Sequence, residues 1–155
     1  MPRLFGQKVR HLRQHQGLTQ TDMARQLGLA SQGHLSNLEQ GRFAPSLDLV
    51  LAIARLLHVA VDYLLRDAIP VEQEAHMADE QRSTAHLAGQ ISALRRQAGL
   101  TQAAFATKLG LAGNAYISML EAGRKAPAPD FLVQLADHLG VTVDTLLLPA
   151  LPTTD

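Results

Sequence analysis

The sequence predicts an all-α protein built from two tandem copies of a five-helix domain. Residues 5–65 align without gaps to residues 87–147, and 26 of the 61 aligned positions are identical. Unrelated sequences match at only a few positions, so the chain contains an internal duplication. No stretch alternates polar and apolar residues over the length of a strand, whereas apolar residues three or four positions apart recur throughout.

The first predicted helix spans residues 4–16. Phe5, Val9 and Leu12 share one of its faces. We expect the other faces to carry the polar side chains, which are Lys8, Arg10, His11, Arg13 and His15. Gly17 ends this helix, since glycine readily adopts the left-handed conformation that follows a helix C-terminus.

The second predicted helix begins after Thr19. Thr19 is a good N-cap, and Asp22 three positions later completes a capping-box pattern. The second copy keeps the cap as Thr101 but has Ala104 in place of the partner. The apolar side of this helix consists of Met23, Ala24 and Leu27.

A turn at residues 28–30 leads to the third predicted helix, which runs to Glu39. Ser31 is expected to be its N-cap, and the corresponding residue of the second copy, Gly113, is a weaker one. Leu35 and Leu38 are spaced to face the core. The residues that then point away from the domain are Gln32, Gly33, His34 and Asn37.

Two more helices complete each copy. Gly41 and Arg42 close the third helix, and Pro45 with Ser46 opens the fourth, at residues 47–57. In the second copy Pro129 takes the first helical position, where proline is favoured. The fifth helix spans residues 61–65, and its copy spans residues 143–147.

We expect the boundaries to be residues 1–67 for the first domain, 68–85 for a linker, 86–148 for the second domain and 149–155 for a disordered tail. The linker is acidic. Its residues 72–82 are rich in helix formers, so this segment is either a helix or a solvated tether.

Composition restricts the class of protein. The chain has 155 residues, a formal net charge of zero and no cysteine, which excludes disulfides, thiolate zinc sites and cysteine nucleophiles. Residues 1–67 hold eight Lys and Arg against five Asp and Glu, giving +3, and residues 68–85 hold one against four, giving −3. Only the first copy has this basic excess. For binding to nucleic acid, a local basic face matters more than the net charge of the whole chain. Without a signal peptide or an apolar run of about 18 residues, we expect a cytoplasmic, nucleoid-associated protein and no membrane partner.

A helix, a short turn with glycine and a second helix form a helix-turn-helix arrangement. The pattern Gly-Leu-Thr-Gln, then Ala and Leu-Gly, then Leu/Ile-Ser-x-x-Glu-x-Gly-Arg-x-x-Pro occurs in order in both copies. It resembles the lambda-repressor/Cro-like family, often called XRE-type. The resemblance covers about 60 residues of each copy and implies a DNA-binding transcriptional regulator, with a repressor favoured.

The resemblance also implies which residues meet DNA. The glutamine that opens the second helix would contact a phosphate, the start of the third helix would read bases, and the arginine after the closing glycine would meet the backbone. In the first copy these are Gln20, Ser31, Gln32, Gly33, His34, Asn37 and Arg42. In the second copy they are Gln102, Asn114, Ala115, Tyr116, Met119, Arg124 and Lys125.

Side-chain chemistry indicates that the first copy contributes more to the reading of DNA bases than the second. Gln32 has the amide needed to pair with adenine, and His34 or Asn37 can take a base or a phosphate. Tyr116 and Met119 offer stacking or methyl contacts and few hydrogen bonds. The two copies therefore either act as a covalent pseudo-dimer on an imperfect palindrome, or the second is an interaction or dimerisation module of an antitoxin-like or accessory protein.

Other site types find little support in the sequence. His11 and His15 have the spacing of metal ligands, but the second copy has Ala93 and Gln97 there. Glu39 and Glu121 recur, which we interpret as a structural ion-pair or capping role within each domain. We see no catalytic set and expect no enzyme activity, no cofactor, no metal and no small-molecule ligand. The expected partner is double-stranded DNA. The apolar residues near each copy's end either pack the two copies together or form a homodimer, and these residues are Val59, Val61, Leu64, Leu65, Val141, Val143, Leu146 and Leu147.

Overall fold

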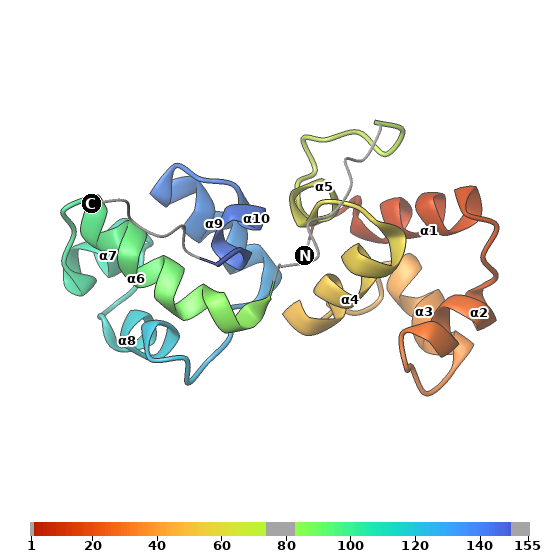
Figure 1. Cartoon of the computed structure of the whole chain (residues 1–155), viewed down its shortest axis with the longest axis horizontal. Coiled ribbons are helices and arrows are strands. Elements are labelled where there is room, and N and C mark those ends of the chain that lie inside the picture. The colour runs from red at the N-terminus through yellow and green to blue at the C-terminus, as the bar shows by residue number, and fades with distance from the viewer. Residues whose placement is uncertain (1, 74–82, 150–155) are drawn as a thin grey trace. The chain divides into compact units, whose positions relative to one another are not determined.

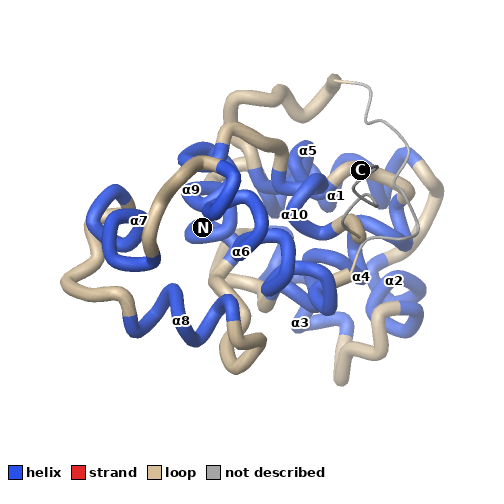
Figure 2. The backbone as a smooth tube through the Cα atoms, turned by 60° about the vertical axis from the view of Figure 1, so that its left-hand side comes forward, coloured by secondary structure: helices blue, strands red, loops and turns tan. Residues whose placement is uncertain are grey.

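The computed structural model describes residues 2–73 and 83–149. The chain divides into two compact units, Met1–Glu80 and Gln81–Asp155 (Figure 1). Within the described residues every regular element is a helix, as Figure 2 shows. The prediction of an all-α chain with five α-helices in each half is confirmed.

The first unit contains α1 (Phe5–His15), α2 (Gln20–Gln26), α3 (Gln32–Glu39), α4 (Leu47–Leu57) and α5 (Val61–Leu65). Local chemistry sets the ends of these helices. Gly17 has a φ of +69° after α1. The capping box forms as predicted, because the Asp22 N–H donates to Thr19 Oγ1 at 3.0 Å and the Thr19 N–H donates to Asp22 Oδ2 at 3.3 Å. Ser46 caps α4 through the Leu49 N–H.

The second unit contains η1 (Thr84–His86), α6 (Leu87–Gln97), α7 (Gln102–Lys108), α8 (Ala115–Glu121), α9 (Pro129–Leu139) and α10 (Val143–Leu147). Pro129 stands at the first turn of α9, as predicted. Thr101 accepts from the Ala104 N–H without an acidic partner.

The N-caps expected for α3 and α8 differ from those in the structure, because neither helix has a side-chain capping bond. Ser31 is the residue before α3, but its hydroxyl accepts no capping bond, and its carbonyl oxygen receives the His34 N–H at 3.2 Å instead. In the second unit α8 begins one residue later than α3, with Asn114 rather than Gly113 as the flanking residue. Asn114 already has nearly helical dihedral angles, so it cannot use its side chain as an extended N-cap does.

The core of each unit is mainly apolar. In the first unit Phe5, Val9 and Met23 are buried, while Leu12 is half-buried. The apolar residues near the ends of the units belong to these cores rather than to a free docking face. Seven of them are at most 2% exposed, namely Val59, Val61, Leu64, Leu65, Val143, Leu146 and Leu147, and Val141 is half-buried.

Lys8, which was expected outside the apolar face of α1, is buried. Its side chain is 0% exposed, and Nζ donates to the carbonyl oxygens of Tyr63 and Arg66 at 2.5 and 2.6 Å. Nζ also lies 4.9 Å from the centre of the Tyr63 ring. Carbonyl groups at the end of a short helix lack partners within it, and the ammonium group supplies them. Burial lowers the pKa of Lys8, although the charge of Asp67 acts in the opposite direction.

In the second unit Gln90 takes the place of Lys8 and donates to the carbonyl groups at the end of the last helix. Its Nε2 donates to the carbonyl oxygens of Leu148 at 3.0 Å and Thr145 at 3.3 Å. The position in both units therefore requires a long side chain with a hydrogen-bond donor at its tip, and not a charge. The aliphatic part of either side chain can lie against apolar neighbours.

Gly6 allows α1 to approach the end of α3 closely. A Cβ atom added to Gly6 would overlap the carbonyl oxygen of Glu39 and lie 2.7 Å from that of Leu38. The corresponding residue of the second unit is Ala88, whose Cβ is 4.0 Å from a Cβ placed on Gly123. A cavity of ≈ 350 Å³ lies at this place in the second unit, lined in part by Leu87, Ala88, Ile91, Leu120 and Pro127.

Two expectations concern segments that the structure leaves undescribed. The helix or tether expected at 72–82 falls mainly on residues 74–82, and the disordered tail expected at 149–155 falls on residues 150–155 except for Pro149. Residues 74–82 and 150–155 lie outside the described residues. Among the helices that are described, none has the length and apolar character needed to cross a membrane.

Candidate nucleic-acid interface

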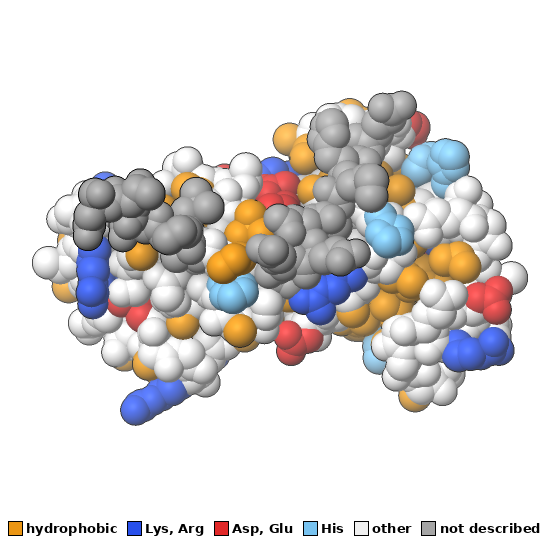
Figure 3. All heavy atoms as spheres, in the orientation of Figure 1, with side chains coloured by type: hydrophobic (Ala, Val, Ile, Leu, Met, Phe, Trp, Pro, Cys, Tyr) orange, Lys and Arg blue, Asp and Glu red, His pale blue; other side chains and the backbone are white. Residues whose placement is uncertain are grey.

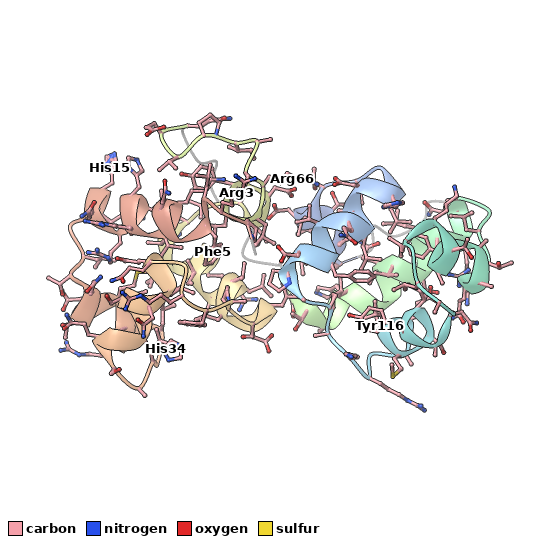
Figure 4. All side chains as sticks on the ribbon, turned by 180° about the vertical axis from the view of Figure 1, so that it is seen from behind. Arg3, Phe5, His15, His34, Arg66 and Tyr116 are labelled. Carbon is pink, nitrogen blue, oxygen red and sulfur yellow. The ribbon has the colours of Figure 1, made fainter. Side chains whose placement is uncertain are left out.

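The α2–turn–α3 pair presents one side of α3 to solvent. Leu35 and Leu38 are 0% exposed and fix the helix to the core, as predicted. The opposite side is exposed and consists of Ser31, Gln32, Gly33, His34 and Asn37. Figure 4 shows the side chain of His34 at the surface of this unit. An apolar side that anchors the helix and a polar side that faces outward is the arrangement that major-groove reading requires.

Glu39, the last residue of α3, connects three helices of the first unit. Arg13 on α1 donates to Glu39 through Nε at 2.6 Å and Nη2 at 3.1 Å. Gln20 at the start of α2 donates through Nε2 to Glu39 Oε2 at 2.9 Å. Arg13 was likewise expected outside the apolar face of α1, and it is only 8% exposed because its guanidinium neutralises a buried carboxylate. The interpretation of Glu39 as a structural ion-pair residue is confirmed.

The second unit repeats this arrangement around Glu121. Arg95 donates through Nε at 2.5 Å and Nη2 at 3.0 Å, and Gln102 donates through Nε2 at 3.0 Å. Burial raises the pKa of Glu121, but the bonds from Arg95 and Gln102 outweigh it, so the pKa lies below its ordinary value. The hydrogen bond to Glu121 raises the pKa of Arg95. Both glutamines that open the second helix are thus held by a carboxylate.

Two amide side chains on the outer side of α3 have their oxygens engaged within the protein. Thr21 Oγ1 donates to Gln32 Oε1 at 2.9 Å. Arg42 Nη1 donates to Asn37 Oδ1 at 3.4 Å, a long hydrogen bond. Thr21 was not expected at the site. It lies 11 residues from Gln32, so no local sequence pattern connects them.

His34 packs against an aromatic ring instead of standing free. Its ring meets that of Phe43 edge-on, with centroids 4.6 Å apart. Ser31, Gly33, His34, Asn37 and Phe43 line an open hollow of ≈ 490 Å³ on this surface. Phe43 was not among the expected site residues, although its position next to Arg42 in the loop after α3 offered a signal.

The corresponding surface of α8 is less polar. Tyr116 is half-buried, and its ring meets that of Phe131 edge-on with centroids 5.1 Å apart. Lys125 Nζ lies 5.0 Å from the centre of the Tyr116 ring. Met119 is 38% exposed and is the one large apolar side chain that stands exposed among the described residues. Asn114, Ala115 and Arg124 are also exposed.

The basic excess of the first unit is smaller at the surface than in the sequence, because Lys8 and Arg13 are buried. On the face drawn in Figure 3, Lys and Arg side chains lie scattered among uncharged ones. Arg42 is an exposed cation near α3, and it extends from the turn that closes the helix. Attraction of this surface for an anionic partner therefore depends on individual exposed cations such as Arg42, and not on the net charge of the unit.

No described group of three or more His, Asp or Glu side chains has the arrangement of a metal site. The rings of His11 and His15 have centroids 6.3 Å apart, at 81° to each other. They belong to a separate hollow of ≈ 410 Å³ beside Leu57 and His58, away from the exposed side of α3.

Comparison with protein families finds a helix-turn-helix model for each of the two units. A model described as "Helix-turn-helix domain" matches residues 4–66, and one described as "Helix-turn-helix" matches residues 91–146. Comparison with curated proteins and with solved structures gave no match. The chain therefore belongs to the lambda-repressor-type helix-turn-helix proteins and carries two tandem domains of a kind that marks DNA-binding regulators.

Proposed function

We propose that the protein is a sequence-specific regulator that represses transcription by occupying an operator in double-stranded DNA, with its two domains acting as a covalent pseudo-dimer. The observation that carries this proposal is the matching geometry of Gln20 and Gln102. Each is fixed by a carboxylate at the end of the recognition helix, at 2.9 and 3.0 Å. One hydrogen of each Nε2 is used in that bond, and the other is left for a phosphate oxygen. The domains are proposed to span residues 1–67 and 86–148.

The two domains are proposed to contribute unequally. The first reads bases with Gln32, Asn37 and the neighbouring surface of α3, and Arg42 meets the backbone. The second contacts a weaker half-site through Tyr116 and Met119, with Gln102, Arg124 and Lys125 on the backbone. Tethering raises the effective concentration of the second domain once the first has bound. Because the two surfaces differ, the preferred operator is an imperfect palindrome.

The test compares Arg42→Ala with Arg124→Ala in the full chain. Binding to a duplex selected from a random pool is measured over a series of salt concentrations. Each lost phosphate contact is expected to reduce the slope of log K against log salt by about 0.9. Arg10→Ala, which removes an exposed cation from α1, is the matched control and should leave the slope unchanged. A chain that selects no sequence would refute the proposal.

A second candidate function follows from the exposed Met119. A solvent-facing methionine on α8, where α3 has Asn37, favours a protein contact over a base contact. In this alternative the first domain binds DNA, and the second is an interaction or dimerisation module of an antitoxin-like or accessory protein.

The double variant Tyr116→Ala with Met119→Ala separates the two functions. If the second domain reads DNA, affinity for the selected duplex falls and the mass in solution stays the same. If it is an interaction module, affinity is retained and the oligomeric mass changes. In that case Arg124→Ala also leaves the salt slope at its wild-type value.

A further inference from the structure

The cavity of ≈ 350 Å³ in the second unit is lined by η1, the first half of α6, the end of α8 and the loop that follows it (Figure 1). Three residues of its lining, Leu87, Ile91 and Leu120, are at most 4% exposed and form its inner wall. Lys125 and Ala126 also line it but are exposed, so they lie at its mouth. The cavity is therefore apolar inside and open to solvent, and its volume is within the range of small-molecule sites.

The first unit has aromatic side chains at two of the corresponding positions. Phe5 stands where the second unit has Leu87, and Phe43 stands where it has Lys125. The Phe5 side chain is 0% exposed, so its ring belongs to the core of the first unit. The second unit lacks that ring and has a cavity instead. The duplicated domain thus indicates which kind of group fits this place, namely an aromatic ring.

The mouth of the cavity carries a positive charge. Among the described residues that line the cavity, Lys125 is the one with a charged side chain. Its Nζ lies 5.0 Å from the centre of the Tyr116 ring, and its flexible stem allows the ammonium group to turn from that ring toward a bound anion. An apolar wall removes a ring from water, while the ammonium group at the mouth pairs with a carboxylate.

We propose that this cavity binds a small aromatic carboxylate, with its ring against Leu87 and Ile91 and its carboxylate on Lys125. From the sequence we expected no small-molecule ligand, because the walls come from separate elements that only the fold brings together.

Lys125 connects this site to DNA. The same ammonium group is proposed above to contact the DNA backbone, so a bound carboxylate would compete with a phosphate for it. This coupling rests on the proposed function of the second domain, whereas binding of the carboxylate does not. By linkage, the ligand and the duplex weaken each other's binding by the same factor.

The first experiment titrates sodium benzoate into the full chain at constant ionic strength and follows the methyl resonances of Leu87 and Ile91 by NMR. We expect a saturable ring-current shift with a Kd on the order of 1 mM. The methyl resonances of Val9, the counterpart of Ile91 in the first unit, should stay in place. Acetate, a carboxylate without a ring, should cause no shift. Benzamide, a ring without a charge, should bind roughly threefold more weakly than benzoate.

Four variants test the two parts of the site. Leu87→Phe supplies the ring covalently and should weaken benzoate binding by about tenfold or more, measured at Ile91. Ala126→Leu narrows the exposed mouth and should have the same effect without a change in the core. Lys125→Met should reduce the affinity for benzoate to that for benzamide. Lys108→Met removes an exposed cation that does not line the cavity, and this matched control should bind benzoate like the wild type.

The second experiment measures the coupling, with a duplex selected from a random pool. Saturating benzoate should weaken binding of the duplex by the wild type and reduce the slope of log K against log salt by about 0.9, since one phosphate contact is lost. Benzoate should have neither effect on Lys125→Met.

The possible failures are distinguishable. The site is overturned if benzoate gives no saturable shift, if acetate binds equally well, or if Leu87→Phe and Ala126→Leu leave the affinity for benzoate unchanged. If benzoate binds as expected but the affinity for DNA stays the same, the site stands and the proposed contact of Lys125 with DNA fails. Helical content measured by circular dichroism confirms that each variant is folded.

Discussion

Arg13 and Glu39 form a two-point ion pair between the first and third helices, with side chains that are 9% and 4% exposed. Breaking a buried pair by removing one partner leaves an uncompensated charge and typically costs about 3–5 kcal/mol. We expect Arg13→Ala to lower the free energy of unfolding of the first domain by about this amount. A loss below about 1 kcal/mol would show that the pair behaves like an exposed one.

Each domain contains one of the two tyrosines, Tyr63 or Tyr116, and the chain has no tryptophan. Tyrosine fluorescence during urea unfolding can therefore report on one domain at a time. The Tyr116→Phe background reports on the first domain, and the Tyr63→Phe background reports on the second. Arg95→Ala in the second background is the matched counterpart of Arg13→Ala.

Acid should weaken the second domain through Glu121. Its folded-state pKa lies below the ordinary value of 4.5, so the unfolded chain binds this proton more readily than the folded domain does. The stabilisation is fully present above the unfolded-state pKa and is lost as the pH falls through the folded-state pKa. Urea unfolding from about pH 6 to about pH 3 should show a steeper loss for the wild type than for Glu121→Gln. Parallel curves would contradict this.

Replacing His58 by glycine should stabilise the first domain. His58 is the described non-glycine residue with a positive φ, 55°, and it ends α4 in the left-handed conformation. The equivalent residue after α9 is Gly140, with a φ of +69°. Left-handed conformations cost L-residues roughly 1 kcal/mol. His58→Gly should therefore raise the stability of the first domain by up to about 1 kcal/mol, less the entropy that glycine loses on folding.

The reciprocal change supplies the control for His58. Gly140→His should destabilise the second domain by about 1 kcal/mol in the same urea assay. If His58→Gly destabilises instead, contacts of the histidine ring outweigh its backbone conformation.

Lys8 should tolerate replacement by glutamine far better than by methionine. Gln90 performs the same task in the second domain, with bonds of 3.0 and 3.3 Å to carbonyl oxygens. Lys8→Met keeps the aliphatic bulk but leaves the carbonyl groups of Tyr63 and Arg66 without this donor, at a cost of about 1–3 kcal/mol. Lys8→Gln should cost at least about 1 kcal/mol less than Lys8→Met in the Tyr116→Phe background. Equal losses would mean that the ammonium charge itself is required.

Gly6→Ala should be strongly destabilising, because the added methyl group would overlap the Glu39 carbonyl oxygen. Overpacking typically costs about 1–3 kcal/mol, and here the obstacle is backbone rather than a movable side chain. Ala88→Gly, the reverse change in the second domain, meets no such contact and should cost only about 1 kcal/mol, from helix propensity. Comparable losses at the two positions would contradict the close approach of α1 to α3.

The helices were predictable because their signals are local. Thr19 with Asp22, and Ser46, begin α2 and α4 through hydrogen bonds within three positions, and Pro129 stands at the first turn of α9. The solvent side of α3 was also predictable, because Leu35 and Leu38 define the opposite side.

Burial of charge was not predictable from periodicity. Lys8 and Arg13 have the spacing of surface residues, but their partners, Tyr63 and Glu39, lie 55 and 26 positions away. The bond from Thr21 to Gln32 is similar, since it forms only when the turn brings α2 and α3 together. Pairings of this kind depend on the tertiary fold and leave no trace in a local pattern.

The position of Glu39 has a consequence for genetic screens. One carboxylate holds the arginine of α1 and the glutamine at the start of α2. Substitutions at Glu39 would therefore be recovered as DNA-binding defects, although their primary effect is on folding. Because Glu121 forms a separate cluster in the second domain, such alleles should disable one domain and leave its duplicate intact.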